Sequence, residues 1–110
     1  MTDDLAELIR EGRVTMLGSI RQELLSGIKA DAQFRTVRDR LRAFPDLPLE
    51  NTDYEEAAAC FNQCRKNGIS GSTTDFLICA VALRHDLAIF TTDKDFVRYR
   101  TVLPVELHER

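Results

Sequence analysis

The residues of this sequence whose types and spacing could do chemistry are acids in its second half. Asp75 stands at the leading edge of an apolar block, Phe76 to Leu83, that is long enough for a helix. A second apolar run, Leu87 to Phe90, ends in an acidic segment that contains Asp93 and Asp95. This order predicts a helix, a turn, a buried strand and an acidic loop. The acids would then lie where a helix begins and a strand ends, the rims at which open α/β sheets hold ligands.

Two of these acids also have a purely structural explanation. Ser72 and Asp75 have the spacing of a helix capping box, and Thr92 and Asp95 repeat that spacing. Asp93 does not fit it and follows a buried strand, so local structure explains this acid least well. For Asp75 and Asp95 the structural and the chemical interpretations both stay open.

Carboxylates gathered at one sheet edge imply a divalent cation. Their mutual repulsion is normally relieved by protonation or by a bound metal ion. Mg²⁺ and Mn²⁺ suit an all-oxygen site, where they polarise a phosphate and generate a nucleophilic hydroxide. The pattern therefore predicts metal-assisted hydrolysis of a phosphodiester. The two histidines, His85 and His108, lie at a helix end and near the C-terminus, so we expect neither to be a catalytic base.

Glu23 is a further candidate acid, on a helix expected after Ser19. Ile20, Leu24 and Ile28 form an apolar stripe at helical spacing, and Glu23 lies at its margin. This position is in the first turns of a helix that follows a predicted strand. An exposed glutamate that favours the positive end of a helix is the simpler explanation of the same residue.

The elements that must position these acids follow from hydrophobic periodicity and turn residues. The pattern predicts an α/β chain. Its first half has a helix over 3–11, a strand Val14 to Leu17, a helix that begins with a Ser19–Gln22 capping box and a charged helix over 31–43. Its second half adds a helix that begins with a Thr52–Glu55 capping box and a short edge strand within 101–107. The buried stripe expected on the charged helix is Phe34, Val37, Leu41 and Phe44. The apolar side expected on the helix after Thr52 is Tyr54, Ala57, Ala58, Phe61 and Cys64.

Length and composition limit the classes of protein to which this sequence can belong. The chain has 110 residues, the size of one domain, and no apolar run approaches the roughly 20 residues that cross a bilayer. Its first residues do not resemble a secretory signal, so we expect a cytoplasmic protein. The three cysteines fall inside helical patterns without paired spacing, and we expect them to be reduced and packed. The net charge of −3 does not indicate a nucleic-acid binder. Attraction of phosphate depends on local charge more than on net charge, and the arginines at 35, 38, 40 and 42 form a basic cluster. A solvated helix face explains these arginines at least as well.

Three segments together resemble a known family. QELLSG at residues 22–27, TTDFLICAVAL at 73–83 and LAIFTTDKDF at 87–96 resemble the PIN domain, with the order found in VapC-like toxin ribonucleases of type II toxin–antitoxin pairs. The resemblance implies a three-layer α/β/α fold with a short parallel sheet flanked by helices. It also implies an acidic pocket that binds Mg²⁺ or Mn²⁺ and cuts single-stranded RNA, an antitoxin partner and a homodimer. The family's acids then fall on Glu23, Asp75 and Asp93, with Thr91 as the adjacent hydroxyl and Asp95 as a further acid.

One feature of the PIN pattern is not found. PIN domains begin with a central strand that ends in Asp followed by Thr or Ser, whereas Asp3 and Asp4 of this sequence precede a predicted helix. We therefore expect residues 1–110 to be a single PIN-like domain, truncated at its N-terminus, with a metal site that lacks one ligand. The alternative is a catalytically dead PIN remnant that acts as a protein-interaction module.

Overall fold

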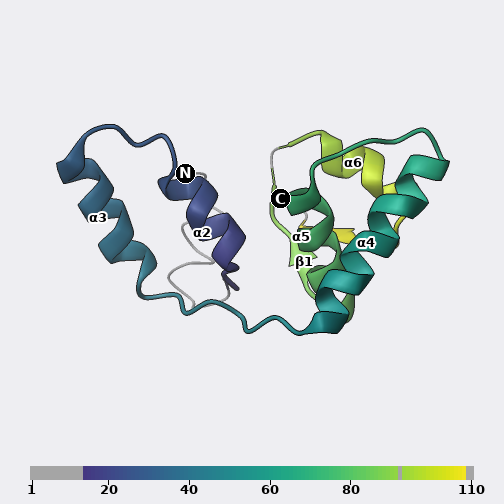
Figure 1. The fold of residues 1–110 in the computed structure, drawn as a ribbon, viewed down its shortest axis with the longest axis horizontal. Helices are drawn as coiled ribbons and strands as arrows, with labels where there is room; N and C mark the ends of the chain where they lie inside the picture. Colours follow the sequence, from purple (N-terminus) through teal and green to yellow (C-terminus); the bar gives the residue numbers. More distant parts are fainter. Residues whose placement is uncertain (1–13, 92, 109–110) are drawn as a thin grey trace. The chain divides into compact units, whose positions relative to one another are not determined.

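The computed structural model describes residues 14–91 and 93–108 and divides the chain into two compact units, Met1–Pro48 and Leu49–Arg110. The first unit contains α2 (Gly18–Leu25) and α3 (Asp31–Leu41). The second contains α4 (Asn51–Lys66), α5 (Thr73–Arg84), β1 (Ala88–Ile89), α6 (Asp95–Arg100) and β2 (Glu106–Leu107), as drawn in Figure 1. The predicted α/β character is confirmed, while the helix predicted over 3–11 lies outside the described residues.

In the first unit the strand predicted at Val14 to Leu17 is wrong. Only Met16 pairs, through a single parallel bridge to Asp46, and the Leu47 N–H donates to the Met16 carbonyl at 2.8 Å. Met16 and Leu17 are nevertheless buried. Leu17 already serves as the N-cap of α2, so the extended segment ends before a ladder can form.

The capping box predicted at Ser19 is also wrong. Because α2 begins at Gly18 with Leu17 as its N-cap, Ser19 lies inside the helix, where its hydroxyl cannot cap the start. The link between α2 and the segment after α3 comes instead from Arg21. Its Nε donates to Asp46 Oδ1 at 2.9 Å and its NH1 donates to the Leu41 carbonyl at 3.0 Å.

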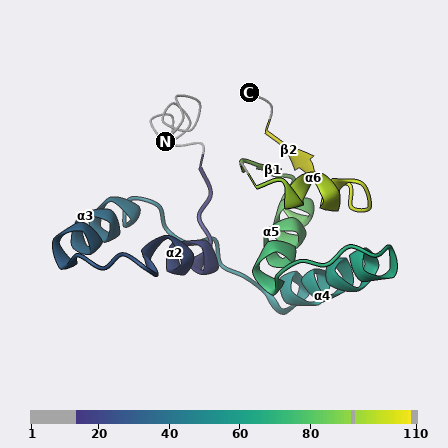
Figure 2. The ribbon, with the colours of Figure 1, turned by 90° about the horizontal axis from the view of Figure 1, so that it is seen from above.

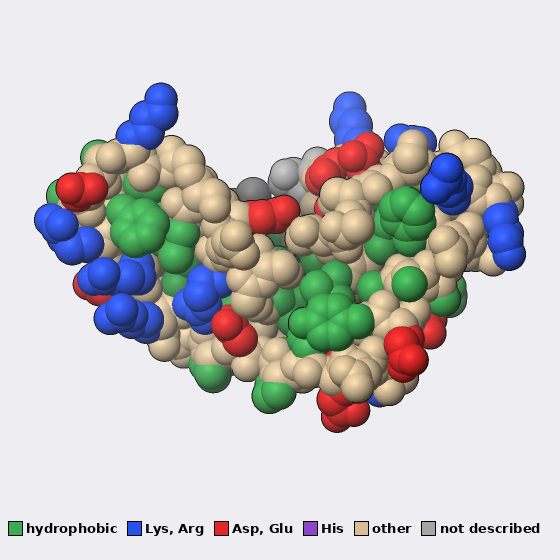
Figure 3. All heavy atoms as spheres, viewed as in Figure 1, with side chains coloured by type: hydrophobic (Ala, Val, Ile, Leu, Met, Phe, Trp, Pro, Cys, Tyr) green, Lys and Arg blue, Asp and Glu red, His purple; other side chains and the backbone are tan. Residues whose placement is uncertain are grey.

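The charged helix predicted over 31–43 is confirmed as α3, but its expected apolar stripe is only half-buried, and none of the α3 residues is buried. Basic side chains gather over this helix in Figure 3. Two of them flank an acid: Arg38 and Arg42 lie 3.1 and 3.7 Å from Asp39. Part of the predicted basic cluster is therefore paired within its own helix.

The second unit is built on the packing of α4 against α5. The core contains three free, buried cysteines, Cys60, Cys64 and Cys79, together with apolar residues of α5, α6 and the strands. Burial is the main cause that raises the pKa of Cys60 to about 11 and that of Cys79 to about 12. These thiols therefore stay protonated and act as small core residues, as the sequence predicts.

On α4 both the predicted cap and the predicted buried face need correction. The helix begins at Asn51, so Thr52 lies inside it, and the Glu50 N–H donates to Asp53 Oδ2 at 2.8 Å. The buried α4 residues are Asp53, Cys60 and Cys64, whereas Tyr54 is 55% exposed. Of the predicted apolar side, Cys64 is buried and Ala57 and Phe61 pack against the core, whereas Ala58 is exposed like Tyr54.

The two strands and α6 form a β-α-β unit. β1 and β2 pair in parallel, with Ala88 opposite Glu106 and Ile89 opposite Leu107. A parallel pair needs a crossover connection, and α6 provides it; Figure 2 shows α6 against the strand pair. The strand predicted at Leu87 to Phe90 and the edge strand predicted within 101–107 are both confirmed, each at a length of two residues. The C-terminal end of β1 thus leads directly into the acidic loop.

None of the helices in residues 14–91 and 93–108 combines the length and apolar character of a membrane span.

Candidate metal centre

Three acids of the second unit come together where two helices begin and a strand ends. Asp75 lies in the first turn of α5, Asp93 lies in the loop after β1, and Asp95 is the first residue of α6. Each offers one carboxylate oxygen, and these oxygens all lie within 4.8 Å of one another. The predicted meeting of a helix start with a strand end is therefore confirmed for these residues.

The start of α5 holds Asp75 from its backbone. Ser72 is the N-cap, and its hydroxyl oxygen accepts a hydrogen bond from the Asp75 N–H at 3.0 Å. This bond is one half of the predicted capping box. The carboxylate itself has another partner, because the Tyr99 hydroxyl donates to Asp75 Oδ2 at 2.7 Å. The backbone of Asp75 thus serves the helix cap while its side chain belongs to the acid cluster.

The acidic loop is held by its own side chains. The Asp93 N–H donates to Thr91 Oγ1 at 3.0 Å, and the Asp95 N–H donates to Asp93 Oδ1 at 2.9 Å. Asp93, which the sequence pattern explained least, therefore has a local structural contact after all. Asp95 lies 3.6 Å from Arg98 NH1, and its side chain is 50% exposed. The proposed cap at Thr92 falls on a residue outside the described range.

The negative charge of the cluster affects the pKa of Tyr99. The pKa of this buried phenol is raised, first because burial disfavours the phenolate, then because of its hydrogen bond to Asp75 and the negative charges of Asp75, Asp95 and Asp93. Three carboxylates at this separation repel one another in the absence of a cation. An all-oxygen donor set with net negative charge fits Mg²⁺ or Mn²⁺, which bind through one or two carboxylates and water.

Glu23 lies on α2, in the first unit, with an exposed side chain. The three acids that the structure brings together all belong to the second unit. The role of Glu23 in a metal site stays a prediction. Thr91, the hydroxyl expected beside Asp93, is confirmed as its neighbour by the hydrogen bond from the Asp93 backbone.

The sequence pattern did not single out Tyr99. This residue is fully buried and packs against Phe76 and Phe96, with ring centroids 4.9 and 5.2 Å away. A signal was present, since Phe96, Tyr99 and Leu103 recur at helical spacing and mark a buried face. A buried tyrosine hydroxyl normally requires a hydrogen-bond partner, and this requirement points to a nearby acceptor.

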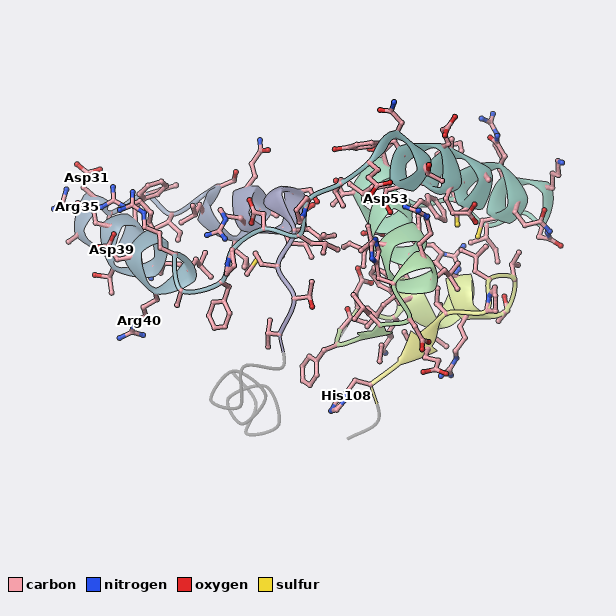
Figure 4. The ribbon with its side chains drawn as sticks, turned by 90° about the horizontal axis from the view of Figure 1, so that it is seen from below. Asp31, Arg35, Asp39, Arg40, Asp53 and His108 are labelled. Atoms are coloured by element: carbon pink, nitrogen blue, oxygen red, sulfur yellow. The ribbon has the colours of Figure 1, made fainter. Side chains whose placement is uncertain are left out.

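Asp53, a buried acid on α4, is a second residue that the sequence pattern did not single out. Asp53 is fully buried near the junction of α4 and α5, as Figure 4 shows. Its Oδ1 accepts a hydrogen bond from Arg84 NH1 and lies 3.3 Å from His85 Nε2. The same carboxylate accepts the Glu50 N–H described above, and this bond, followed by those from Arg84, holds the pKa of Asp53 below its ordinary value of 3.8 against the opposing effect of burial. Asp53 therefore joins the start of α4 to the end of α5.

Comparison with known proteins agrees with this arrangement. A model of the PIN domain family matches residues 2–102. The chain is 33% identical over 86 residues to VapC ribonuclease Mb1587 of Mycobacterium bovis and to ribonuclease VapC11 of Mycobacterium tuberculosis. The matched segment covers 76% of this chain and 64% of each relative, so the chain spans less than two thirds of their length. The family match extends over α2 and over the acid cluster of α5 and α6, and the chain belongs to the PIN-domain family.

Proposed function

We propose that this protein is a divalent-metal-dependent endoribonuclease that hydrolyses phosphodiester bonds in single-stranded RNA, as the toxin of a type II toxin–antitoxin pair. The observation that carries the proposal is the cluster of Asp75, Asp93 and Asp95, whose carboxylate oxygens lie within 4.8 Å of one another. Membership of the PIN family and similarity to proteins named VapC ribonucleases support RNA as the substrate.

The three clustered acids would hold Mg²⁺ or Mn²⁺. When bound, such an ion supplies Lewis acidity toward a phosphate and an activated water as nucleophile. The remaining work belongs to the chain. The Asp95 N–H holds the Asp93 carboxylate by a hydrogen bond, and the Asp95 carboxylate lies beside it. Thr91 accepts the Asp93 N–H through its oxygen and retains its own O–H proton for donation, for example to a phosphate oxygen of the substrate.

Glu23 is proposed as a fourth acid of the same site. The support is the resemblance of residues 22–27 to the family's second acidic motif and the single family match that spans residues 2–102. The exposed position of Glu23 on α2 leaves its carboxylate accessible to an ion or a substrate.

The proposal extends to partners and location. The resemblance of the three acidic motifs to toxin ribonucleases supports a cognate antitoxin, a homodimer and a cytoplasmic location. An antitoxin that contributes positive charge would satisfy the acid cluster in the same way as a cation does, which gives inhibition a direct physical basis.

A second candidate function is a protein-interaction module without catalysis. It is favoured by the contacts that the acids make within the chain. Asp93 accepts the Asp95 N–H, and Asp95 lies beside Arg98, so both acids have a structural role. Metal binding separates the two candidates. A site that exists only for structure and for contacts to another protein would show no selective affinity for a small divalent or trivalent cation.

The two tyrosines of the chain provide the test of metal binding. There is no tryptophan, so Tb³⁺, which also takes oxygen ligands, would be sensitised only by Tyr54 or Tyr99. Tyr99 is bonded to Asp75, whereas Tyr54 lies on α4 and is exposed. We expect tyrosine-excited Tb³⁺ luminescence in the wild type and in Tyr54→Phe, its loss in Tyr99→Phe, and its displacement by Mn²⁺. Emission that survives Tyr99→Phe but disappears in Tyr54→Phe would place the bound ion elsewhere and refute the proposed centre.

A further inference from the structure

Tyr99 contacts the acid cluster from a distant position in the sequence. Its hydroxyl, on α6, donates to Asp75 Oδ2 at 2.7 Å across 24 positions of sequence. The ring is fully buried among aromatic neighbours, so the side chain has little freedom to move the hydroxyl elsewhere. The cluster therefore has one carboxylate whose orientation is set from the hydrophobic core.

The backbone of Gly71 also lies close to the Tyr99 hydroxyl. A Cβ atom built on Gly71 would lie 2.1 Å from the Tyr99 hydroxyl oxygen and 2.7 Å from Cζ, both far inside van der Waals contact. The backbone before α5 thus approaches the phenol as closely as a glycine permits. Its φ does not lie in the left-handed region, so the need for glycine here comes from the contact with Tyr99.

Packing alone does not explain a tyrosine at this position. A phenylalanine would fill the same space between Phe76 and Phe96 without placing a polar atom in the core. The hydroxyl is tolerated because it has an acceptor, and that acceptor is one of three carboxylates that repel one another. Without a restraint, repulsion from Asp93 and Asp95 would favour rotation of Asp75 away from the cluster.

We propose that Tyr99 is a positioning residue of the metal centre, which holds the Asp75 carboxylate toward Asp93 and Asp95, and that Gly71 makes room for its hydroxyl. This inference rests on the proposed metal-dependent function. One hydrogen bond at Oδ2 leaves the other lone pairs of Asp75 for a cation. Outer groups that orient ligating carboxylates in this way contribute about 10- to 100-fold to metal affinity.

The direct experiment compares two variants that each remove one tyrosine hydroxyl. We expect Tyr99→Phe to weaken Mn²⁺ binding by the full chain, measured by calorimetry, by about 10- to 100-fold. Tyr54→Phe is the matched control, because its exposed hydroxyl lies on α4, and its affinity should stay within about two-fold of the wild type. Unchanged affinity in Tyr99→Phe would overturn the inference and leave the proposed function standing, whereas a wild-type chain without Mn²⁺ affinity would overturn both.

A double-mutant cycle distinguishes positioning from a general structural role. If Tyr99 acts through Asp75, then Tyr99→Phe should cause no further loss of Mn²⁺ affinity once Asp75→Asn is present. If the hydroxyl affects Mn²⁺ affinity by a route that does not involve Asp75, the two losses should multiply, and that result would overturn the inference. The melting temperature of each variant is measured in parallel, because a structural role would lower it without changing the affinity of the folded chain.

Gly71→Ala provides a second route that keeps both Tyr99 and Asp75. The new methyl group would displace the hydroxyl, so the loss of Mn²⁺ affinity should match that of Tyr99→Phe.

A measurement on the wild-type chain covers the case in which neither variant folds. Addition of Mg²⁺ should shift the NMR resonance of Tyr99 Cζ and leave that of Tyr54 in place, and equal shifts or none would overturn the inference.

Discussion

Asp93→Asn should lower the rate of metal-dependent RNA cleavage by at least about a thousand-fold while leaving the chain folded. A bound divalent ion contributes several kcal/mol of charge stabilisation, and about 4 kcal/mol corresponds to a thousand-fold in rate. Asparagine keeps the side-chain oxygen that accepts the Asp95 N–H, so the acidic loop retains this hydrogen bond. The substitution therefore removes the charge and preserves the local structure.

The measurement is single-turnover cleavage of a single-stranded RNA by the full-length protein, with and without a chelator. Asp39→Asn is the matched control, because Asp39 is an exposed acid of α3 that pairs with Arg38 of the same helix and with Arg42, its C-cap. Its rate should equal that of the wild type. Circular dichroism checks that both variants are folded. Wild-type cleavage by Asp93→Asn would refute its role as a metal ligand.

Glu23→Gln belongs in the same series because its position in the metal site is an untested prediction. If Glu23 is the fourth acid, this variant should lose cleavage and Mn²⁺ affinity together, as Asp93→Asn does. If it is only an exposed glutamate of α2, both quantities should stay at the wild-type level. The comparison therefore decides between the two interpretations that the sequence pattern leaves open.

Asp53→Ala should cause the largest loss of stability among single substitutions of acids in the described residues. Asp53 is fully buried and accepts hydrogen bonds from the Glu50 N–H and from Arg84. Truncation would leave both donors without this acceptor. One of them is the charged, half-buried Arg84, and removal of one partner of such a hydrogen-bonded pair is destabilising. We expect the melting temperature to fall by on the order of 10 °C or more.

Thermal unfolding followed by circular dichroism provides the measurement. Asp39→Ala is the control, because its exposed pairs with Arg38 and Arg42 should contribute little, about 2 °C or less. A melting temperature of Asp53→Ala equal to that of the control would contradict the structural role of the pair of Asp53 and Arg84.

The lowered pKa of Asp53 predicts that the stability of the folded chain depends on pH. Because the pKa of Asp53 is lower in the folded chain than its ordinary value of 3.8, the folded state binds this proton less readily than the unfolded state. The stabilising contribution is therefore complete above the unfolded pKa and is lost as the pH falls through the folded pKa. Asp53→Asn should remove this part of the acid-induced loss, and an identical pH profile in both proteins would refute it.

Local pattern was sufficient for the elements that carry the acids. The apolar block after Asp75 became α5, the short run before the acidic loop became β1, and the acids met where a helix begins and a strand ends. Such features depend on neighbouring residues, and their periodicity and caps can be read from a few positions. Pattern failed at Ser19 and Thr52, because each has the spacing of a capping box but lies inside its helix.

Only the tertiary structure decided which side chains hold those elements together. The bond from Tyr99 to Asp75 spans 24 positions, and the pair of Asp53 with Arg84 spans 31. A carboxylate at the start of a helix looks the same in sequence whether its partner is a backbone amide, a core phenol or an arginine of another helix. The choice depends on which groups the packed core excludes from water, since burial makes each polar atom require a specific partner.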